Sequence, residues 1–158
     1  MIKVAEALES SFAKIDPANA NDYKAGLDKL KTALTGVDNQ YKQGFTSCQH
    51  KTFITSHAAF GYMAERYGLT QASISGIDPE TEPSPAEMAN IKSVVEKTGV
   101  KTIFTEELVS DAPAKAIAAE TGAETSVLSP LESKPERGDY TDTITTNLDR
   151  LKSAMVCK

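Results

Sequence analysis

The feature that most constrains the fold is the alternation of short apolar runs with helical patterns from residue 52 onward. Four runs rich in β-branched, aromatic and other apolar residues are separated by segments of helical periodicity; they are 52–56, 72–77, 101–106 and 125–129. Strands that alternate with helices indicate βαβ units, because parallel strands need a crossover connection. We therefore predict an α/β fold with a four-stranded, mainly parallel sheet flanked by helices.

The helices carry their own start and stop signals. Ser84 is an N-cap residue, Pro85 occupies the first helical position, and Glu87 completes a capping box. Gly99 ends this helix, and Gly122 ends the next one. These signals place two of the crossover helices between predicted strands.

Two further helices precede the first strand. Residues 1–14 have an amphipathic pattern that is broken at Asp16-Pro17. A longer helix follows from about Asp22 to Phe45, with apolar residues at alternating steps of four and three. A last helix is predicted over 140–155, at the end of the chain.

Composition excludes some classes of partner. The 158 residues carry a formal charge of −5 and 40% hydrophobic residues, which is ordinary for a globular domain. There is no basic cluster, so we expect no nucleic-acid partner, and no apolar run approaches transmembrane length. The N-terminus reads as an amphipathic helix and not as a signal peptide, so the targeting segment of an exported protein is expected to be absent from this chain.

Several candidate sites fail on their own chemistry. Ser56 and His57 are adjacent on an extended strand and point to opposite faces, which argues against a hydrolase. The segment 73–85 holds one glycine and several acidic residues, which would repel phosphate. A compact zinc site from Cys48, His50 and His57 has an unusual spacing and lacks a fourth ligand.

The most informative residue is His57, one of only two histidines. It follows the first predicted strand, Glu106 and Glu107 follow the third, and 131–139 follows the fourth. The carboxyl ends of parallel strands share one edge of a sheet, where ligands bind. This topology connects His57 with an acidic partner that is distant in sequence.

Two interpretations of His57 remain open from the residues alone. It is either a neutral imidazole bonded to backbone at a strand end, or a metal ligand paired with Asp139 or, as an alternative, Asp142. The two cysteines, Cys48 and Cys157, leave a similar choice. They are either unrelated buried thiols or a disulfide that closes a long loop.

Six blocks of this sequence resemble a known family. They are "FITSHAAFGYMAERYGL", "SISGIDPETEPSPAEM", "TIFTEELVS", "AIAAETGA", "SVLSPLE" and "DYTDTITTNLDRLKSAM". In order and spacing they are similar to the carboxy-terminal lobe of the metal-specific solute-binding proteins of ABC importers, the zinc/manganese class. The resemblance spans 1–158, and "SHAAFGY" followed by "EPSP" is its most specific pair.

The resemblance implies a metal receptor and not an enzyme. In this family two α/β lobes are joined by a long helix, and the metal lies between them. This chain then divides into a helical segment at 1–50, which includes the inter-lobe helix, and a carboxy-terminal α/β lobe at 51–158. The native protein would lie outside the cytoplasm, in the periplasm or lipid-anchored at the cell surface, and would deliver its metal to an ABC permease.

The resemblance also assigns site residues. His57 falls on the third metal ligand of the family, and Asp139 on the final carboxylate. The interval from Asp139 to Asn147 is slightly short for the family, which keeps Asp142 as a substitute. A histidine at the third position favours zinc, with manganese as the other cargo of this class. Related members with cysteines at both corresponding positions favour a Cys48–Cys157 disulfide.

The resemblance implies that this sequence corresponds to one half of such a receptor. Nothing corresponds to the amino-terminal lobe or to its two histidines, so the remaining metal ligands are expected from that absent lobe. The alternative function is that the isolated lobe binds no metal tightly and acts as a folding or self-association unit. In that case the long helix would expose its apolar stripe to a second copy.

Overall fold

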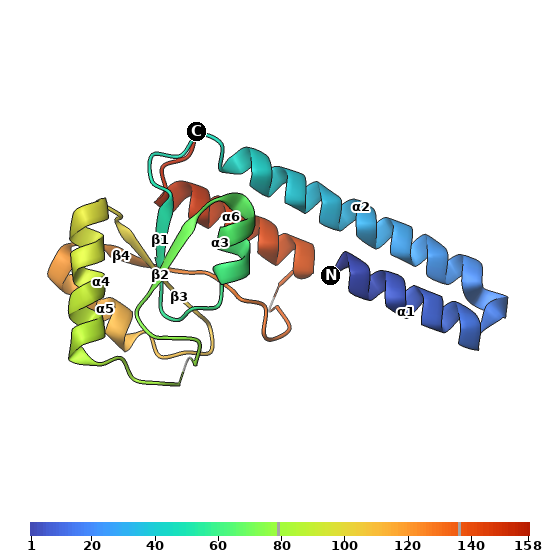
Figure 1. Ribbon diagram of the computed structural model, residues 1–158, viewed down its shortest axis with the longest axis horizontal. Helices are drawn as coiled ribbons and strands as arrows, with labels where there is room; N and C mark the ends of the chain where they lie inside the picture. The colour runs from blue at the N-terminus through green and yellow to red at the C-terminus, as the bar shows by residue number, and fades with distance from the viewer. Residues whose placement is uncertain (79, 136) are drawn as a thin grey trace. The chain divides into compact units, whose positions relative to one another are not determined.

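The computed structural model describes residues 1–78, 80–135 and 137–158 (Figure 1). Its contacts divide the chain into two compact units, Met1–Gln40 and Tyr41–Lys158. The division after residue 50 into a helical segment and a lobe stays a prediction.

The first unit is helical. It comprises α1 (Ile2–Ile15), the short 3-10 helix η1 (Pro17–Asn19) and most of α2 (Ala20–Gly44). Asp16 lies at the break, where its carboxylate accepts hydrogen bonds from the Tyr23 hydroxyl at 2.8 Å and the Asn19 amide at 2.7 Å. The two predicted helices and the break between them are therefore confirmed. No helix in the described parts of the chain is long and apolar enough to cross a membrane.

The second unit is built on a parallel sheet. Its strands are β1 (Thr52–Thr55), β2 (Thr70–Ser73), β3 (Thr102–Thr105) and β4 (Glu124–Val127). All neighbouring pairs are parallel, and the spatial order is β2-β1-β3-β4. The predicted α/β fold with a four-stranded sheet is confirmed, and the sheet is parallel throughout.

One strand begins earlier than predicted. The sequence placed the second strand at 72–77, whereas β2 starts at Thr70 because that residue pairs with Thr52 of β1. The apolar residues Ala72 and Ile74 drew the prediction too far along the chain. The backbone hydrogen bonds with β1 continue past the end of β2, because the Ile74 amide donates to the Thr55 carbonyl at 3.0 Å.

Helices cover both faces of the sheet. Figure 1 shows α4 (Pro85–Thr98) and α5 (Ala112–Thr121) on one side, with α3 (Gly61–Tyr67) and α6 (Tyr140–Ala154) on the other. The core beneath α4 and α5 consists of buried aliphatic residues, which are Ile54, Ile74, Ile91, Val95, Val100, Ile103, Ala114, Ile117 and Ala118. Because side chains alternate along a strand, Phe53 and Phe104 are buried on the α6 side.

A buried amide fixes α6 to the end of β4. The Asn147 side chain donates to the Ser129 carbonyl at 2.7 Å and accepts from the Ser129 amide at 3.1 Å. Asn147 is 3% exposed, so the pair satisfies polar groups that burial would otherwise leave unbonded. This contact holds α6 against the residues that follow β4.

The predicted helix signals are present in α4. The Ser84 hydroxyl accepts from the Glu87 amide at 3.3 Å, and the Glu87 carboxylate accepts from the Ser84 amide at 2.7 Å. Gly99 and Gly122 follow α4 and α5 with φ of +70°, a conformation that favours glycine. Both predicted helix ends are confirmed.

Replacing Ser84 with alanine is expected to destabilise the chain by about 1 kcal/mol, the usual effect of losing an N-cap. The backbone and side-chain hydrogen bonds of Ser84 hold the pKa of Glu87 below its ordinary value. A depressed carboxyl pKa stabilises the fold above the unfolded pKa, and this contribution is lost as the pH falls through the folded pKa. Urea unfolding at neutral pH and in acid should show the Ser84→Ala deficit shrinking in acid; an equal deficit at both pH values would contradict this.

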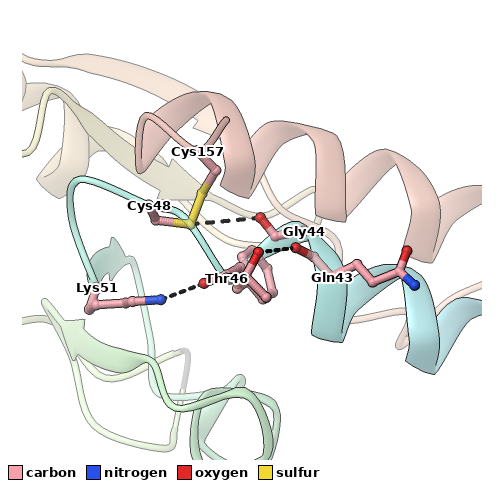
Figure 2. The surroundings of a disulfide bond; sticks show 7 residues. Gln43, Gly44, Thr46, Cys48, Lys51 and Cys157 are labelled. Carbon is pink, nitrogen blue, oxygen red and sulfur yellow. Dashed lines mark hydrogen bonds between the residues drawn. A yellow bond between two sulfur atoms is a disulfide. The ribbon is translucent and has the colours of Figure 1, made fainter.

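A disulfide joins the segment before β1 to the residues that follow α6. Cys48 and Cys157 are bonded across a sequence separation of 109 residues, as the resemblance implied. Figure 2 shows the bridge beside the end of α2, with Cys48 Sγ 3.7 Å from the Gly44 carbonyl oxygen. The His50 amide also donates to the Met155 carbonyl at 3.1 Å. The segment before β1 and the end of α6 are therefore held together by covalent and hydrogen bonds.

Candidate metal site

His57 lies just beyond the carboxyl end of β1, and its backbone is held firmly. Its carbonyl oxygen accepts hydrogen bonds from the Thr55 hydroxyl at 2.7 Å and the Gln71 side chain at 3.0 Å. Gln71 comes from β2 and also accepts from the Phe60 amide at 3.2 Å. Two strands and the start of α3 thus fix the main chain from which the imidazole projects.

The imidazole of His57 faces the carboxylate of Glu106. His57 Nδ1 and Glu106 Oε1 are 2.5 Å apart, and each side chain is only 3% exposed. Glu106 directly follows β3, so both residues lie at the carboxyl edge of neighbouring strands. The prediction that this edge joins His57 to a distant acidic residue is confirmed for Glu106, whereas Glu107 is exposed.

The electrostatics of this pair are governed by burial. Removal from water raises the pKa of Glu106 above its ordinary value, and the adjacent imidazole opposes that change. The carboxylate of Glu132 raises the pKa of Glu106 further by repulsion. A buried carboxylate in this position requires a donor or a positive charge nearby.

The pair retains unused hydrogen-bonding capacity. Among the described residues, His57 Nδ1 and both Glu106 oxygens are buried without a hydrogen bond of good geometry, although Nδ1 and Oε1 are in contact. Buried polar atoms without partners are rare, and they mark places where a proton or an ion is expected. This is the strongest chemical signal at the carboxyl edge.

Asp139 is exposed and is the N-cap residue of α6. Its Oδ1 accepts hydrogen bonds from the amides of Thr141 at 2.7 Å and Asp142 at 3.0 Å, and from the Thr141 hydroxyl at 2.6 Å. Hydrogen bonding by Thr141 lowers the pKa of Asp139, so the carboxylate stays ionised. Asp142 completes the capping box by accepting from the Asp139 amide at 3.0 Å. This capping role was not predicted from the sequence.

Among the described residues, His57 is joined to neither of its candidate carboxylate partners, Asp139 and Asp142, although those two are hydrogen-bonded to each other. No ion pair or hydrogen bond links His57 to Asp139 or Asp142 within 1–78, 80–135 and 137–158. The same ranges hold no cluster of three or more histidine, cysteine, aspartate or glutamate side chains able to surround a metal. His57 and Glu106 are the site residues that the structure brings together, and their contact was not predicted as a pair.

The structure also does not bring Cys48, His50 and His57 together as a zinc site. Cys48 is in the disulfide, and His50 precedes β1 whereas His57 follows it. The two histidines are therefore at opposite ends of a strand that spans roughly 13 Å.

An open pocket of about 630 Å³ adjoins the edge that carries His57. Ser56 and Ser75 contribute to its wall from the ends of β1 and β2, and the carboxylates of Glu80, Glu82 and Glu132 also line it. An acidic wall suits cations better than anions.

The family follows from comparison with known proteins. The model of the family described as zinc-uptake complex component A, periplasmic (ZnuA), matches residues 1–154. The chain belongs to the ZnuA family. This membership confirms the predicted resemblance, and it places the chain among binding proteins of transport systems and not among enzymes.

Two curated members of the ZnuA family illustrate the match. The high-affinity zinc uptake system protein ZnuA of Bacillus subtilis is 37% identical over 161 residues, which cover 99% of this chain and 50% of that protein. The zinc-binding protein AdcA of Streptococcus pyogenes is 38% identical over 156 residues, which cover 96% of this chain and 30% of that protein. The chain thus spans half or less of the length of these relatives.

Solved structures of other proteins share the fold. The laminin-binding protein Lmb of Streptococcus agalactiae, described as a bifunctional adhesin and metal transporter, has a TM-score of 0.87 at 37% identity. The match covers 93% of this chain and 58% of that one. The Zn(II)-bound ZnuA-like domain of Streptococcus pneumoniae AdcA has a TM-score of 0.79 at 34% identity, with 98% and 60% covered.

Proposed function

We propose that this chain is the carboxy-terminal lobe, with the joining helix, of an extracytoplasmic receptor that captures zinc and delivers it to an ABC permease. The observation that carries the proposal is His57, a buried imidazole at the carboxyl edge of the sheet whose neighbouring polar atoms lack hydrogen-bond partners. Relatives named as zinc-binding and zinc-uptake proteins support zinc as the cargo. Imidazole also suits zinc better than manganese, which is the alternative cargo.

In this proposal the lobe supplies two ligands, His57 and Asp139. Three hydrogen bonds converge on Oδ1 of Asp139, which orients the carboxylate and leaves Oδ2 to approach a metal. Zinc in proteins is usually four-coordinate, so the remaining ligands would come from an amino-terminal lobe. The family is described as periplasmic, and AdcA of Streptococcus pneumoniae is named a lipoprotein; both support a location outside the cytoplasm.

The test is calorimetric titration of zinc into this chain and its variants. With two ligands available we expect weak binding, with a Kd of about 1 μM or higher, because a closed zinc site needs about four ligands. His57→Ala should abolish the heat, whereas His50→Ala should leave it unchanged because His50 lies at the other edge of the sheet. Binding should weaken in acid, since a protonated imidazole cannot ligate a metal.

A second pair of variants separates Asp139 from Asp142. Asparagine retains a capping oxygen, so Asp139→Asn and Asp142→Asn keep the start of α6 while removing one charge each. The proposal expects Asp139→Asn to weaken zinc binding and Asp142→Asn to have little effect; the reverse would move the ligand to Asp142. Identical traces for the unaltered chain and His57→Ala would overturn the proposal.

The second candidate function is a self-associating lobe without tight metal binding. The observation in its favour is an exposed apolar face on α1, where Val4 is 58%, Leu8 50% and Phe12 48% exposed. Sedimentation velocity over a range of chain concentrations distinguishes the two. A monomer at all concentrations would remove this candidate.

A further inference from the structure

We propose that Glu106 is a positioning residue for His57. Its carboxylate accepts a hydrogen bond from His57 Nδ1–H, which fixes the neutral imidazole in one tautomer and leaves Nε2 as the atom that ligates a metal. The role in metal binding rests on the proposed function, but the tautomer does not.

The contact distance determines which ring nitrogen is available. Nδ1 and Oε1 are 2.5 Å apart. Zinc lies about 2.0–2.2 Å from both nitrogen and oxygen ligands, so two atoms bound to one tetrahedral ion are more than 3 Å apart. A metal therefore cannot lie between His57 and Glu106 in this arrangement. A proton can, and the metal must approach the other nitrogen, Nε2.

Burial explains why the proton belongs on Nδ1. Both side chains are 3% exposed, and neither Glu106 oxygen has a hydrogen bond of good geometry to another side chain among the described residues. An unbonded buried carboxylate is costly, and in a neutral imidazole one nitrogen donates while the other accepts. Placing the donor at Nδ1 satisfies Nδ1 and one carboxylate oxygen together.

The surrounding backbone makes Glu106 the controlling group. The main chain of His57 is already fixed, because Thr55 and Gln71 both donate to its carbonyl oxygen. Neither of these side chains reaches the ring through a hydrogen bond that the structure contains. Glu106 contacts the ring itself at Nδ1, so we assign to it the orientation of the imidazole and the choice of tautomer. Carboxylates behind metal-ligating histidines have this effect in many sites.

The tautomer can be measured directly by ¹⁵N NMR of the metal-free chain labelled in histidine. The chain has two histidines, so His50→Gln assigns the remaining ring signals to His57. We expect the Nδ1–H tautomer in the unaltered chain. Glu106→Ala should shift His57 toward the Nε2–H tautomer that predominates in free histidine. Glu106→Gln should restore Nδ1–H, because its side-chain oxygen can accept the same hydrogen bond.

Glu107→Ala is the matched control, since Glu107 is adjacent in sequence but exposed. It should leave both the tautomer and the fold unchanged. Circular dichroism of every variant shows whether it is folded, and Glu106→Gln keeps the test valid if Glu106→Ala fails to fold. An Nε2–H tautomer in the unaltered chain, or no change in folded Glu106→Ala, would overturn the inference.

Zinc titration of the same variants links the tautomer to metal binding. Removing a carboxylate behind a ligating histidine weakens metal binding by about 10–100-fold, so we expect that loss in Glu106→Ala and recovery in Glu106→Gln. A changed tautomer with unchanged zinc affinity would overturn the positioning role. If the unaltered chain bound no zinc, the proposed function would fail while the NMR result still decided the tautomer.

Discussion

Replacing Ile103 with alanine is expected to lower the free energy of unfolding of the Tyr41–Lys158 unit by about 2–5 kcal/mol. Ile103 is fully buried in β3, one of the two central strands, and belongs to the core beneath α4 and α5. Alanine removes three carbon atoms from a site enclosed by the sheet, so a cavity remains. Small domains are stable by only about 5–15 kcal/mol, and the change is therefore a large part of the total.

Ile77→Ala is the matched control, because the same side chain is 84% exposed at that position. Its effect should lie within about 0.5 kcal/mol of zero. Urea unfolding followed by the near-ultraviolet circular dichroism of tyrosine reports on this unit, where Tyr41 and Tyr67 pack with ring centroids 5.0 Å apart. Similar losses for the two alanine variants would show that Ile103 does not occupy the core described here.

The sequence predicted the fold well wherever local chemistry sets the structure. The ends of α4 and α5 depend on Ser84, Gly99 and Gly122, whose preferences act within one turn. The second strand was placed too late because its start depends on pairing of Thr70 with Thr52, a contact across the sheet. Apolar periodicity alone does not report which residues pair.

The candidate site was only partly predictable for the same reason. Parallel topology places His57 and Glu106 at one edge, so their proximity could be anticipated from the strand order. Their direct contact depends on two side-chain directions that no local pattern encodes. The N-cap role of Asp139, in contrast, could have been predicted from the local sequence. An aspartate that is followed three residues later by another acidic residue can cap a helix.

Removing the disulfide by the double substitution Cys48→Ser and Cys157→Ser is expected to destabilise the chain by about 2–4 kcal/mol. The bond closes a loop whose ends are 109 residues apart, and in the chain-entropy model its loss increases the freedom of the unfolded chain. Urea unfolding of the oxidised chain and the double variant measures the difference. Adding a reductant should lower the stability of the original chain and leave the double variant unchanged.

This loss of stability should leave the His57 site intact. The bridge joins the segment before β1 to the end of α6, whereas His57 follows β1 and Asp139 begins α6. The 15 residues of α6 separate its two ends by roughly 22 Å. Below its unfolding transition, the double variant should therefore show the same His57 tautomer as the original chain. A changed tautomer in the folded double variant would mean that the disulfide also positions the site, and free thiols in the unreduced original chain would exclude the bond itself.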